Sequence, residues 1–309
     1  MAESAPLVSV VIPVYNDPEG IRTTLESVTN QTYPDDEFEI VVADNGSADE
    51  TLDIIYKFYN EYHDLVSVVQ ENEIQSSYAA RNKGIEKARG EIILFIDADM
   101  CVEDTWIESV TQQMQKNKWD FLGCDVRLFI PEGETTIFAR YNRLFDLRVR
   151  DHIENHNVVP TCSLVVKKRI ITEHGDFDER LVSGGDGEFS RRIFEAGYEP
   201  KFLADVIMYH PARTTFKALI IKQFRLGRGF EQCRRHHPDR MARPKLVNPR
   251  LYLPSLPWKF YSRYRQRAHL YKEEISLTIF VVFYLIGYMH KLIRTSGRIY
   301  ERATYLIKY

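Results

Sequence analysis

The sequence predicts an α/β fold, in which a Rossmann-like, mostly parallel sheet is flanked by helices and followed by a helical C-terminal region. Two observations predict it. Over the first 210 residues, short apolar segments of strand length alternate with segments of helical periodicity, as in sheets built from strand–helix–strand units. Residues 211–309 lose this alternation and become basic and apolar. We therefore expect two domains, an α/β one over 1–210 and an appended helical one over 211–309.

The predicted strands are apolar nearly throughout, which is typical of strands buried on both faces. They cover residues 7–13, 39–43, 66–69, 92–96, 121–129, 158–166 and 201–204. The first is expected to end at Pro13, because proline cannot donate a hydrogen bond to a neighbouring strand. Since helices separate the first four, we expect parallel strands joined by right-handed crossovers.

The predicted helices follow apolar residues at helical spacing. They cover residues near 20–31, 47–62, 77–89, 105–116, 137–150 and 188–196. Ser47 and Glu50 match the capping-box pattern, so the second helix is expected to begin at Ser47. Gly90 is expected to close the third.

Carboxylates stand where the predicted strands end. Asp97 and Asp99 follow the isoleucine-rich strand 92–96, and Asp44 ends the second strand. Ligands in open α/β sheets bind beyond the carboxyl ends of strands, so these side chains are placed to meet one. Two carboxylates around one small residue can share a hard cation such as Mg²⁺, or divide a cation and a hydroxyl between them. The alternative is a polar loop whose spacing arose by chance.

Several classes of protein are disfavoured by what the strand ends lack. No G-x-G-x-x-G pattern and no P-loop pattern follows the first strand, which argues against a dinucleotide-binding enzyme and a P-loop NTPase. The four cysteines are widely separated and form no CxxC pair, so we expect a reducing compartment and no zinc site.

Charge is divided unequally along the chain. Residues 1–210 carry 20 Lys and Arg against 39 Asp and Glu, whereas residues 211–272 carry 16 against Glu231 and Asp239 alone. A basic segment of this density favours an anionic partner, either a membrane or a nucleic acid. The alternative is a solvated helical face that is basic by chance.

Five short segments occur in the order and at the spacing of a known family. They are Val-Val-Ile-Pro-Val-Tyr-Asn (10–16), Asp-Asn-Gly-Ser-Ala-Asp-Glu-Thr (44–51), Ala-Ala-Arg-Asn-Lys-Gly (79–84), Asp-Ala-Asp (97–99) and Gly-Gly-Asp-Gly-Glu-Phe-Ser-Arg-Arg (184–192). On these segments, residues 7–210 resemble the family 2 inverting glycosyltransferases. The resemblance implies the GT-A fold and a nucleotide-sugar donor, with uridine as the commonest base.

The resemblance also implies which residues bind the donor. Around the nucleotide base it places Pro13, Tyr15, Asn16, Asp44 and Arg81. It places Asp97 near the ribose and Asp99 on Mg²⁺ or Mn²⁺, with His210 completing the metal site or contacting the diphosphate. Asp44 could instead form a helix-capping turn, Arg81 a surface salt bridge, and His210 a structural contact.

Inverting transfer also needs a base that takes the proton of the acceptor hydroxyl. The family usually has Glu-Asp where this chain has Gly185-Asp186, so by the resemblance the role falls to Asp186. Glu188 is the second candidate, as base or acceptor ligand. The alternative for Asp186 is that it only caps the helix 188–196. Arg191 and Arg192 could reach phosphates or balance nearby acids.

The C-terminal region combines basic, aromatic and apolar residues. Aromatic residues between 258 and 271 interleave with Lys and Arg, which favours either lipid headgroups or single-stranded nucleic acid. The uncharged segment 275–289 decides for an anionic membrane and against a nucleic-acid partner. At about 22 Å as a helix, it is shorter than the ~30 Å hydrocarbon core. A tilted span, a re-entrant helix, an interfacial helix and a buried core helix stay open, and residues 291–309 are expected to form a second amphipathic helix.

The sequence thus predicts a membrane-associated, metal-dependent, inverting glycosyltransferase. We expect it to act on a lipid-linked glycan acceptor at the cytoplasmic face of the cell membrane, because positive flanks stay inside. One alternative is a sugar nucleotidyltransferase, although the Gly- and Arg-rich phosphate loop of that class is absent after Pro13. The other is a non-catalytic nucleotide-sugar-binding membrane adaptor, which Asp97, Asp99 and Asp186 together disfavour.

Overall fold

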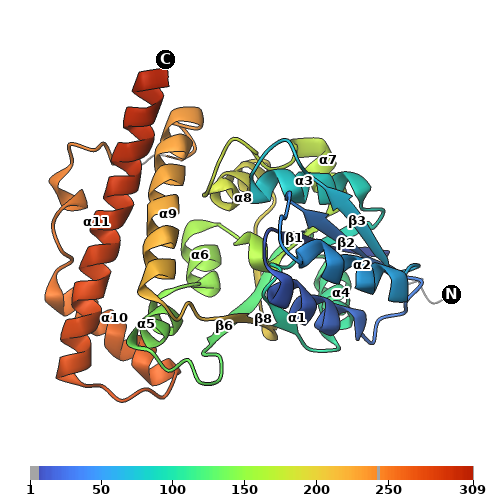
Figure 1. Ribbon diagram of the computed structural model, residues 1–309, viewed down its shortest axis with the longest axis horizontal. Coiled ribbons are helices and arrows are strands. Elements are labelled where there is room, and N and C mark those ends of the chain that lie inside the picture. Colours follow the sequence, from blue (N-terminus) through green and yellow to red (C-terminus); the bar gives the residue numbers. More distant parts are fainter. Residues whose placement is uncertain (1–6, 242–243, 309) are drawn as a thin grey trace. The chain divides into compact units, whose positions relative to one another are not determined.

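The computed structural model describes residues 7–241 and 244–308 and divides into two compact units (Figure 1). The first unit comprises Met1–Arg127, Arg148–Leu181 and Gly185–His210. The second comprises Leu128–Leu147, Val182–Gly184 and Pro211–Tyr309. The sequence-based division places residues 128–147 in the first domain, whereas they belong to the second unit.

The sheet confirms the predicted α/β class. In order β3-β2-β1-β4-β7-β6-β8-β5, its strands are β1 (Val8–Val14), β2 (Phe38–Asp44), β3 (Val66–Gln70), β4 (Ile92–Phe95), β5 (Cys101–Val102), β6 (Phe121–Phe129), β7 (Leu164–Lys167) and β8 (Lys201–Pro211). The first four in this order pair in parallel. Antiparallel pairs follow, between β4 and β7, β6 and β7, and β5 and β8. The short β5 was not predicted from the sequence.

β1 runs one residue past the predicted end at Pro13, to Val14, and its pairing explains why. Val11 and Phe95 form the last pair between β1 and β4. The Val14 carbonyl accepts from Asn45 beyond β2, while the Val11 carbonyl accepts from Ile96 beyond β4. Pro13, two residues after Val11, therefore faces the β4 side beyond the last pair, where no amide hydrogen is needed.

The helices of the first unit are α1 (Pro18–Thr29), α2 (Thr51–Glu61), α3 (Ser77–Lys87), α4 (Trp106–Asn117), α6 (Val149–His156), α7 (Lys168–His174) and α8 (Gly185–Glu195). Five of them match predicted helices to within a few residues, whereas α6 and α7 were not predicted as separate helices. The predicted capping box is wrong: α2 is preceded by Glu50, and the Ser47 hydroxyl instead accepts from the Asn16 amide at 2.9 Å. The predicted helix 137–150 is broken at Leu147, where φ is +36°.

The second unit is helical. It contains α5 (Ile137–Phe145), α9 (Phe216–His236), α10 (Pro257–Leu270) and α11 (Leu277–Lys308). α9 and α11 lie side by side (Figure 1). Two glycines allow this approach, because a Cβ atom at Gly227 would lie 2.0 Å from the Arg294 carbonyl oxygen, and one at Gly297 2.2 Å from that of Phe224. α11 is continuous, so the second helix predicted over 291–309 is its C-terminal half.

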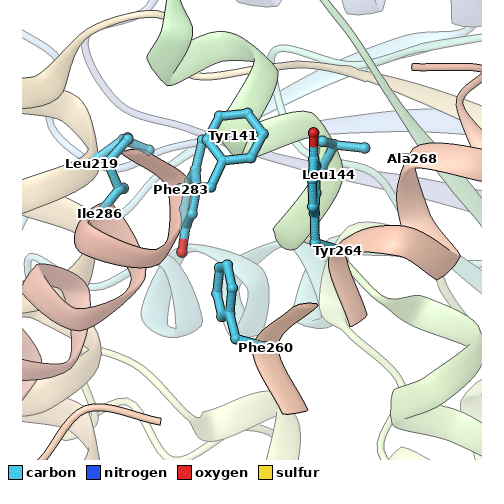
Figure 2. Close-up of a cluster of buried hydrophobic side chains, with 8 residues drawn as sticks. All are labelled: Tyr141, Leu144, Leu219, Phe260, Tyr264, Ala268, Phe283 and Ile286. Carbon is cyan, nitrogen blue, oxygen red and sulfur yellow. The ribbon is translucent and has the colours of Figure 1, made fainter. Parts of the chain in front are cut away.

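Aromatic and aliphatic side chains from all four of these helices form one buried cluster (Figure 2). Its members are Tyr141, Leu144, Leu219, Phe260, Tyr264, Ala268, Phe283 and Ile286. Phe283 makes edge-to-face contacts with Tyr141 and Tyr264, at 5.6 Å between ring centroids in each case. Such geometry favours aromatic pairs beyond the area they bury. The cluster gives the second unit its own core.

Charged residues also join α9 to α11. Arg298 donates to Glu231 at 3.0 Å, and both side chains are almost completely buried. Arg228 donates to Glu301 at 3.0 Å. Removing one partner of a buried pair typically costs about 3–5 kcal/mol, because the other charge stays in a poorly solvated place. These ion pairs hold the C-terminal half of α11 against α9.

Candidate active site

The parallel strands β1, β2 and β4 end at one edge of the sheet, and half of the predicted site residues lie at or just beyond these strand ends: Pro13, Tyr15, Asn16, Asp44, Asp97 and Asp99. Two loops are tied together there. The Asn16 amide donates to Ser47, and its side-chain Oδ1 accepts from the Ala48 amide at 2.8 Å. This places Asn16 in the left-handed region, with φ of +49°. Tyr15, just before it, is half exposed, so its ring is free to lie against a planar ligand.

Asp44 shapes the turn at the end of β2. Its carboxylate is buried and accepts from the amides of Gly46 and Ser47, each at 3.1 Å from Oδ2. These bonds match the turn-forming alternative considered for Asp44. Its contact with a nucleotide base, like that of Pro13, stays a prediction.

Buried Arg81 and partly exposed Asp97 form an ion pair at the end of β4. Arg81 projects from α3, and its Nη2 donates to Asp97 Oδ1 at 2.5 Å. Its Nη1 donates to the Ser77 carbonyl at 3.1 Å. Within the described residues, the buried Nε hydrogen of Arg81 has no acceptor. The salt bridge weighed as an alternative exists, but its arginine is buried, its aspartate is partly exposed, and the Nε hydrogen of Arg81 is left without an acceptor among the described residues.

Asp99 and His210 are brought together by the strand that the sequence analysis missed. β5 starts at Cys101 and pairs with β8, with Cys101 opposite Tyr209. This register places His210 Nε2 3.7 Å from Asp99 Oδ1, with the imidazole buried and the carboxylate partly exposed. In the part of the chain that the structure describes, no three or more His, Cys, Asp or Glu residues form a metal-binding group. The roles of Asp99 and His210 as metal ligands stay predictions.

Asp186 lies in the first turn of α8, because this helix begins at Gly185 and not after Asp186 as predicted. Burial raises the pKa of Asp186 above its ordinary value, and the Gly187 amide, His152 and Arg81 oppose this shift. A carboxylate with a raised pKa is a stronger base towards a hydroxyl proton. Since Arg81 acts on both Asp186 and Asp97, the candidate base and the donor-side carboxylate lie within electrostatic reach of one guanidinium.

Two titratable neighbours of this site were missed by sequence reasoning. His152 lies on α6, in no recognisable motif, and burial lowers its pKa. Asp17 accepts from the Gly20 amide at 3.0 Å at the start of α1. Burial raises the pKa of Asp17, and the nearby Asp99 adds to the rise. Asp17 caps α1 and directly precedes Pro18, which is a local signal for the start of a helix but does not reveal the proximity of Asp99.

Glu188, Arg191 and Arg192 follow Asp186 along α8. Glu188 is buried and accepts from Arg192 Nη2 at 3.0 Å. Arg192 also donates to the carbonyls of Gly175 and Asp176, at 2.7 and 2.6 Å. This pair therefore ties α8 to the loop after α7. Arg191 is partly exposed. Contacts of the three with acceptor or phosphates stay predictions.

Known proteins resemble this chain in sequence and in fold. Glycosyl transferase family 2 matches residues 9–171, just over half of the chain. The glycosyltransferase AglE of Haloferax volcanii is 34% identical over 304 residues, which cover 97% of each protein.

Two solved structures share the fold at low identity. The mannosyltransferase PcManGT from Pyrobaculum calidifontis, in complex with GDP-Man and Mn²⁺, superposes with a TM-score of 0.64 at 16% identity, over 97% of this chain and 88% of that one. S. aureus TarS 1–349, in complex with UDP-GlcNAc, gives 0.56 at 17% identity, over 98% and 92%. These likenesses confirm the predicted GT-A fold. With the sequence matches, they show that the chain is a glycosyltransferase and belongs to glycosyl transferase family 2.

Proposed function

We propose that this protein is a metal-dependent, inverting glycosyltransferase that moves a sugar from a nucleoside-diphosphate sugar, UDP being favoured, to the hydroxyl of a lipid-linked glycan. One observation carries the proposal: the guanidinium of Arg81 pairs with Asp97 and acts on the half-buried Asp186. The proposed donor-binding carboxylate and the candidate base thus both interact with the guanidinium of Arg81, at the edge where ligands of α/β sheets bind.

Donor binding uses the residues at the ends of β1, β2 and β4. The ring of Tyr15 is exposed for stacking on a base. Asp97 offers oxygens to ribose hydroxyls, and Arg81 has a buried Nε hydrogen that no described residue accepts. Uridine is favoured because it is the commonest base in the family; GDP is the other candidate.

Asp186 is the proposed base. It takes the proton of the acceptor hydroxyl while that oxygen attacks the anomeric carbon on the face opposite the diphosphate. The bond between this carbon and the phosphate oxygen breaks, the nucleoside diphosphate leaves with the electron pair, and the configuration inverts. Burial favours the reaction, because the raised pKa of Asp186 makes it a better proton acceptor.

Asp99 and His210 are the proposed protein ligands of Mg²⁺ or Mn²⁺. A carboxylate suits both ions, Mg²⁺ commonly takes one or two carboxylates with substrate phosphates and water, and a neutral imidazole is the commonest protein ligand of metals in general. A cation bound there would offset the negative charge of the leaving diphosphate. Asp99 is partly exposed, which leaves room for substrate oxygens.

Attachment to the cytoplasmic face of a membrane is proposed for the second unit. Among the described residues, one helix, over Leu277–Ile307, is by length and composition able to span a bilayer. Phe283 and Ile286 are buried in the unit's core, whereas Leu277, Val281 and Leu285 are exposed. This one-sided burial favours a helix lying in the interface. An enzyme held there would meet a lipid-linked acceptor.

A calorimetric donor screen tests the binding part of the proposal. The full chain is titrated with UDP and with GDP, in Mn²⁺ or Mg²⁺ and then in EDTA. We expect the wild-type protein to bind UDP and EDTA to weaken this binding. In Asp99→Asn, the affinity for UDP should be the same with and without the metal. If the affinity for the nucleotide is the same in EDTA, the metal dependence is contradicted. If only GDP binds, the donor is a GDP-sugar and not a UDP-sugar.

The transfer part is tested separately. UDP release from a UDP-sugar is followed with a polyprenyl-linked saccharide in detergent, against the free saccharide at equal concentration. Faster release with the lipid-linked form supports the acceptor assignment, and equal rates contradict it.

A further inference from the structure

Tyr78 of α3 reaches the first turn of α8, more than a hundred residues later in the chain. Its hydroxyl accepts from the Gly185 amide at 2.9 Å, and its side chain is buried. Burial raises the pKa of this phenol, and hydrogen bonds from the amides of Asp186 and Gly185 oppose the shift. The hydroxyl therefore stays protonated and meets the backbone at and beside Asp186.

The position of this contact matters for the helix. The first amides of an α-helix have no partner within it and need one from outside. Gly185 is the first residue of α8, and a side chain from another helix accepts its hydrogen. The ring is also in close contact: a Cβ atom at Gly185 would lie 2.8 Å from it. Ring and hydroxyl together fix where α8 begins.

The same face of α3 carries the donor-side contact. Arg81 stands one helical turn after Tyr78, its guanidinium 5.9 Å from the Tyr78 ring centroid, and it pairs with Asp97. α3 itself is seated tightly on β1, because a Cβ atom at Gly84 would lie 2.4 Å from the Val11 side chain. One turn of a firmly packed helix thus touches both the residue assigned to the ribose and the backbone of the residue assigned as base.

We propose that Tyr78 is a positioning residue for glycosyl transfer: its hydroxyl fixes the first turn of α8, and with it the Asp186 carboxylate, relative to the donor held by Arg81 and Asp97. The proposal rests on the proposed function, which assigns Asp186 as base. Small displacements of a catalytic group cost large factors in rate, so one hydrogen bond to its backbone is enough to matter.

Tyr78→Phe tests this, since it keeps the ring against Gly185 and removes only the hydroxyl. We expect kcat to fall by roughly tenfold to a hundredfold, while the donor KM and the calorimetric Kd for UDP and Mn²⁺ (or GDP, if that is what binds) change less than twofold. The acidic limb of the kcat profile should move to lower pH, because a loosened first turn exposes Asp186 to water. Rates are divided by the number of donor-binding sites titrated.

Tyr33→Phe is the matched control. Tyr33 is a buried tyrosine before β2 whose hydroxyl bonds to Thr111, away from the carboxyl ends of the strands. The Tyr33→Phe substitution should leave kcat and the pH profile of kcat unchanged. A purely structural role of buried phenols would instead affect both variants alike.

The outcomes separate the inference from its premise. If Asp186→Asn is inactive and Tyr78→Phe keeps the wild-type kcat, the positioning role is overturned and the base assignment stands. If Asp186→Asn keeps its activity, the assignment of Asp186 as base is contradicted, and with it the positioning role of Tyr78 that rests on it. A Tyr78→Phe chain that binds no donor also overturns the inference, because the hydroxyl would then hold the fold.

Discussion

At the scale of single residues, the proposed chemistry of the site depends on the half-buried Asp186. Replacing it by Asn keeps the shape and removes the base. We expect Asp186→Asn to lower kcat by about 10²- to 10⁴-fold, the usual contribution of general base catalysis. The control is Asp205→Asn, an exposed carboxylate on β8, which should keep full activity. A similar loss in both variants would point to a general effect of charge.

Asp186→Asn, which should lower activity, should at the same time raise the stability of the folded protein. Because burial raises the pKa of Asp186 in the folded protein, its ionised form costs free energy of folding, and this cost appears as pH rises through the raised pKa. Asp186→Asn should therefore increase the free energy of unfolding at neutral pH. The gain should shrink as the pH falls towards the ordinary pKa of aspartate. Denaturant titrations at several pH values measure it; a constant difference at all pH values would contradict the pKa shift.

The sequence correctly predicted the position of site residues that directly follow or end a strand, although their roles stay predictions. Asp44 and Asp97 stand at strand ends, and Asp99 follows within two residues. Tyr78 and His152 carry no such signal, because their relation to Asp186 exists only after α3, α6 and α8 have packed.

At the scale of elements, α11 combines two kinds of surface. Leu277, Val281 and Leu285 recur every four residues and are exposed, while its C-terminal half is bound to α9. Nearby in sequence, α10 exposes Trp258 and Tyr261 among basic residues. Aromatic and basic side chains together are typical of a helix at the level of lipid headgroups.

Vesicle binding tests this surface. Serine at positions 277, 281 and 285 should abolish sedimentation of the full chain with anionic vesicles and leave UDP binding intact. Ile299→Ser with Leu306→Ser, two exposed positions in the C-terminal half of α11, is the matched control and should bind as wild type does. If the first variant still sediments, the membrane contact lies elsewhere.

The crossing of α9 and α11 gives a prediction on stability. Gly227→Ala would place a Cβ atom 2.0 Å from the Arg294 carbonyl oxygen, so the helices must move apart. We expect a loss of about 1–3 kcal/mol in the free energy of unfolding, as for other overpacked sites. Urea titration measures it. Ser296→Ala, exposed on α11, should change stability by less than about 0.5 kcal/mol, and an equally small effect of Gly227→Ala would disprove the tight crossing.

Element boundaries were predicted less well than elements, for local reasons. The break at Leu147 needs a positive φ at a residue that rarely adopts one, and no glycine or proline marks it. Ser47 has the sequence of a cap, but its hydroxyl serves Asn16 in the neighbouring loop. Long-range hydrogen bonds of this kind compete with local patterns and are invisible in them.

At the scale of the whole molecule, the second unit depends on a distant part of the chain. Tyr141 and Leu144 of α5 are buried against Leu219, Phe260 and Phe283. A chain that ends at residue 210 loses these partners and exposes an apolar surface. We expect it to bind a hydrophobic dye and to aggregate in size-exclusion chromatography.

The matched variant of the truncated chain carries Tyr141→Ser and Leu144→Ser, which should reduce both dye binding and aggregation. A truncated chain that is monomeric without these changes would show that α5 is stable alone. The sequence could not reveal this dependence, because the helical pattern of 137–150 shows an apolar face but not what covers it.

The discontinuity of the second unit limits how such enzymes can be recombined. Its residues come from three stretches, Leu128–Leu147, Val182–Gly184 and Pro211–Tyr309. A chimaera that exchanges only the C-terminal hundred residues between relatives would separate α5 from the helices that it packs against here, and would mismatch the cluster around Phe283. We expect such a graft to fold well only when α5 is exchanged together with residues 211–309.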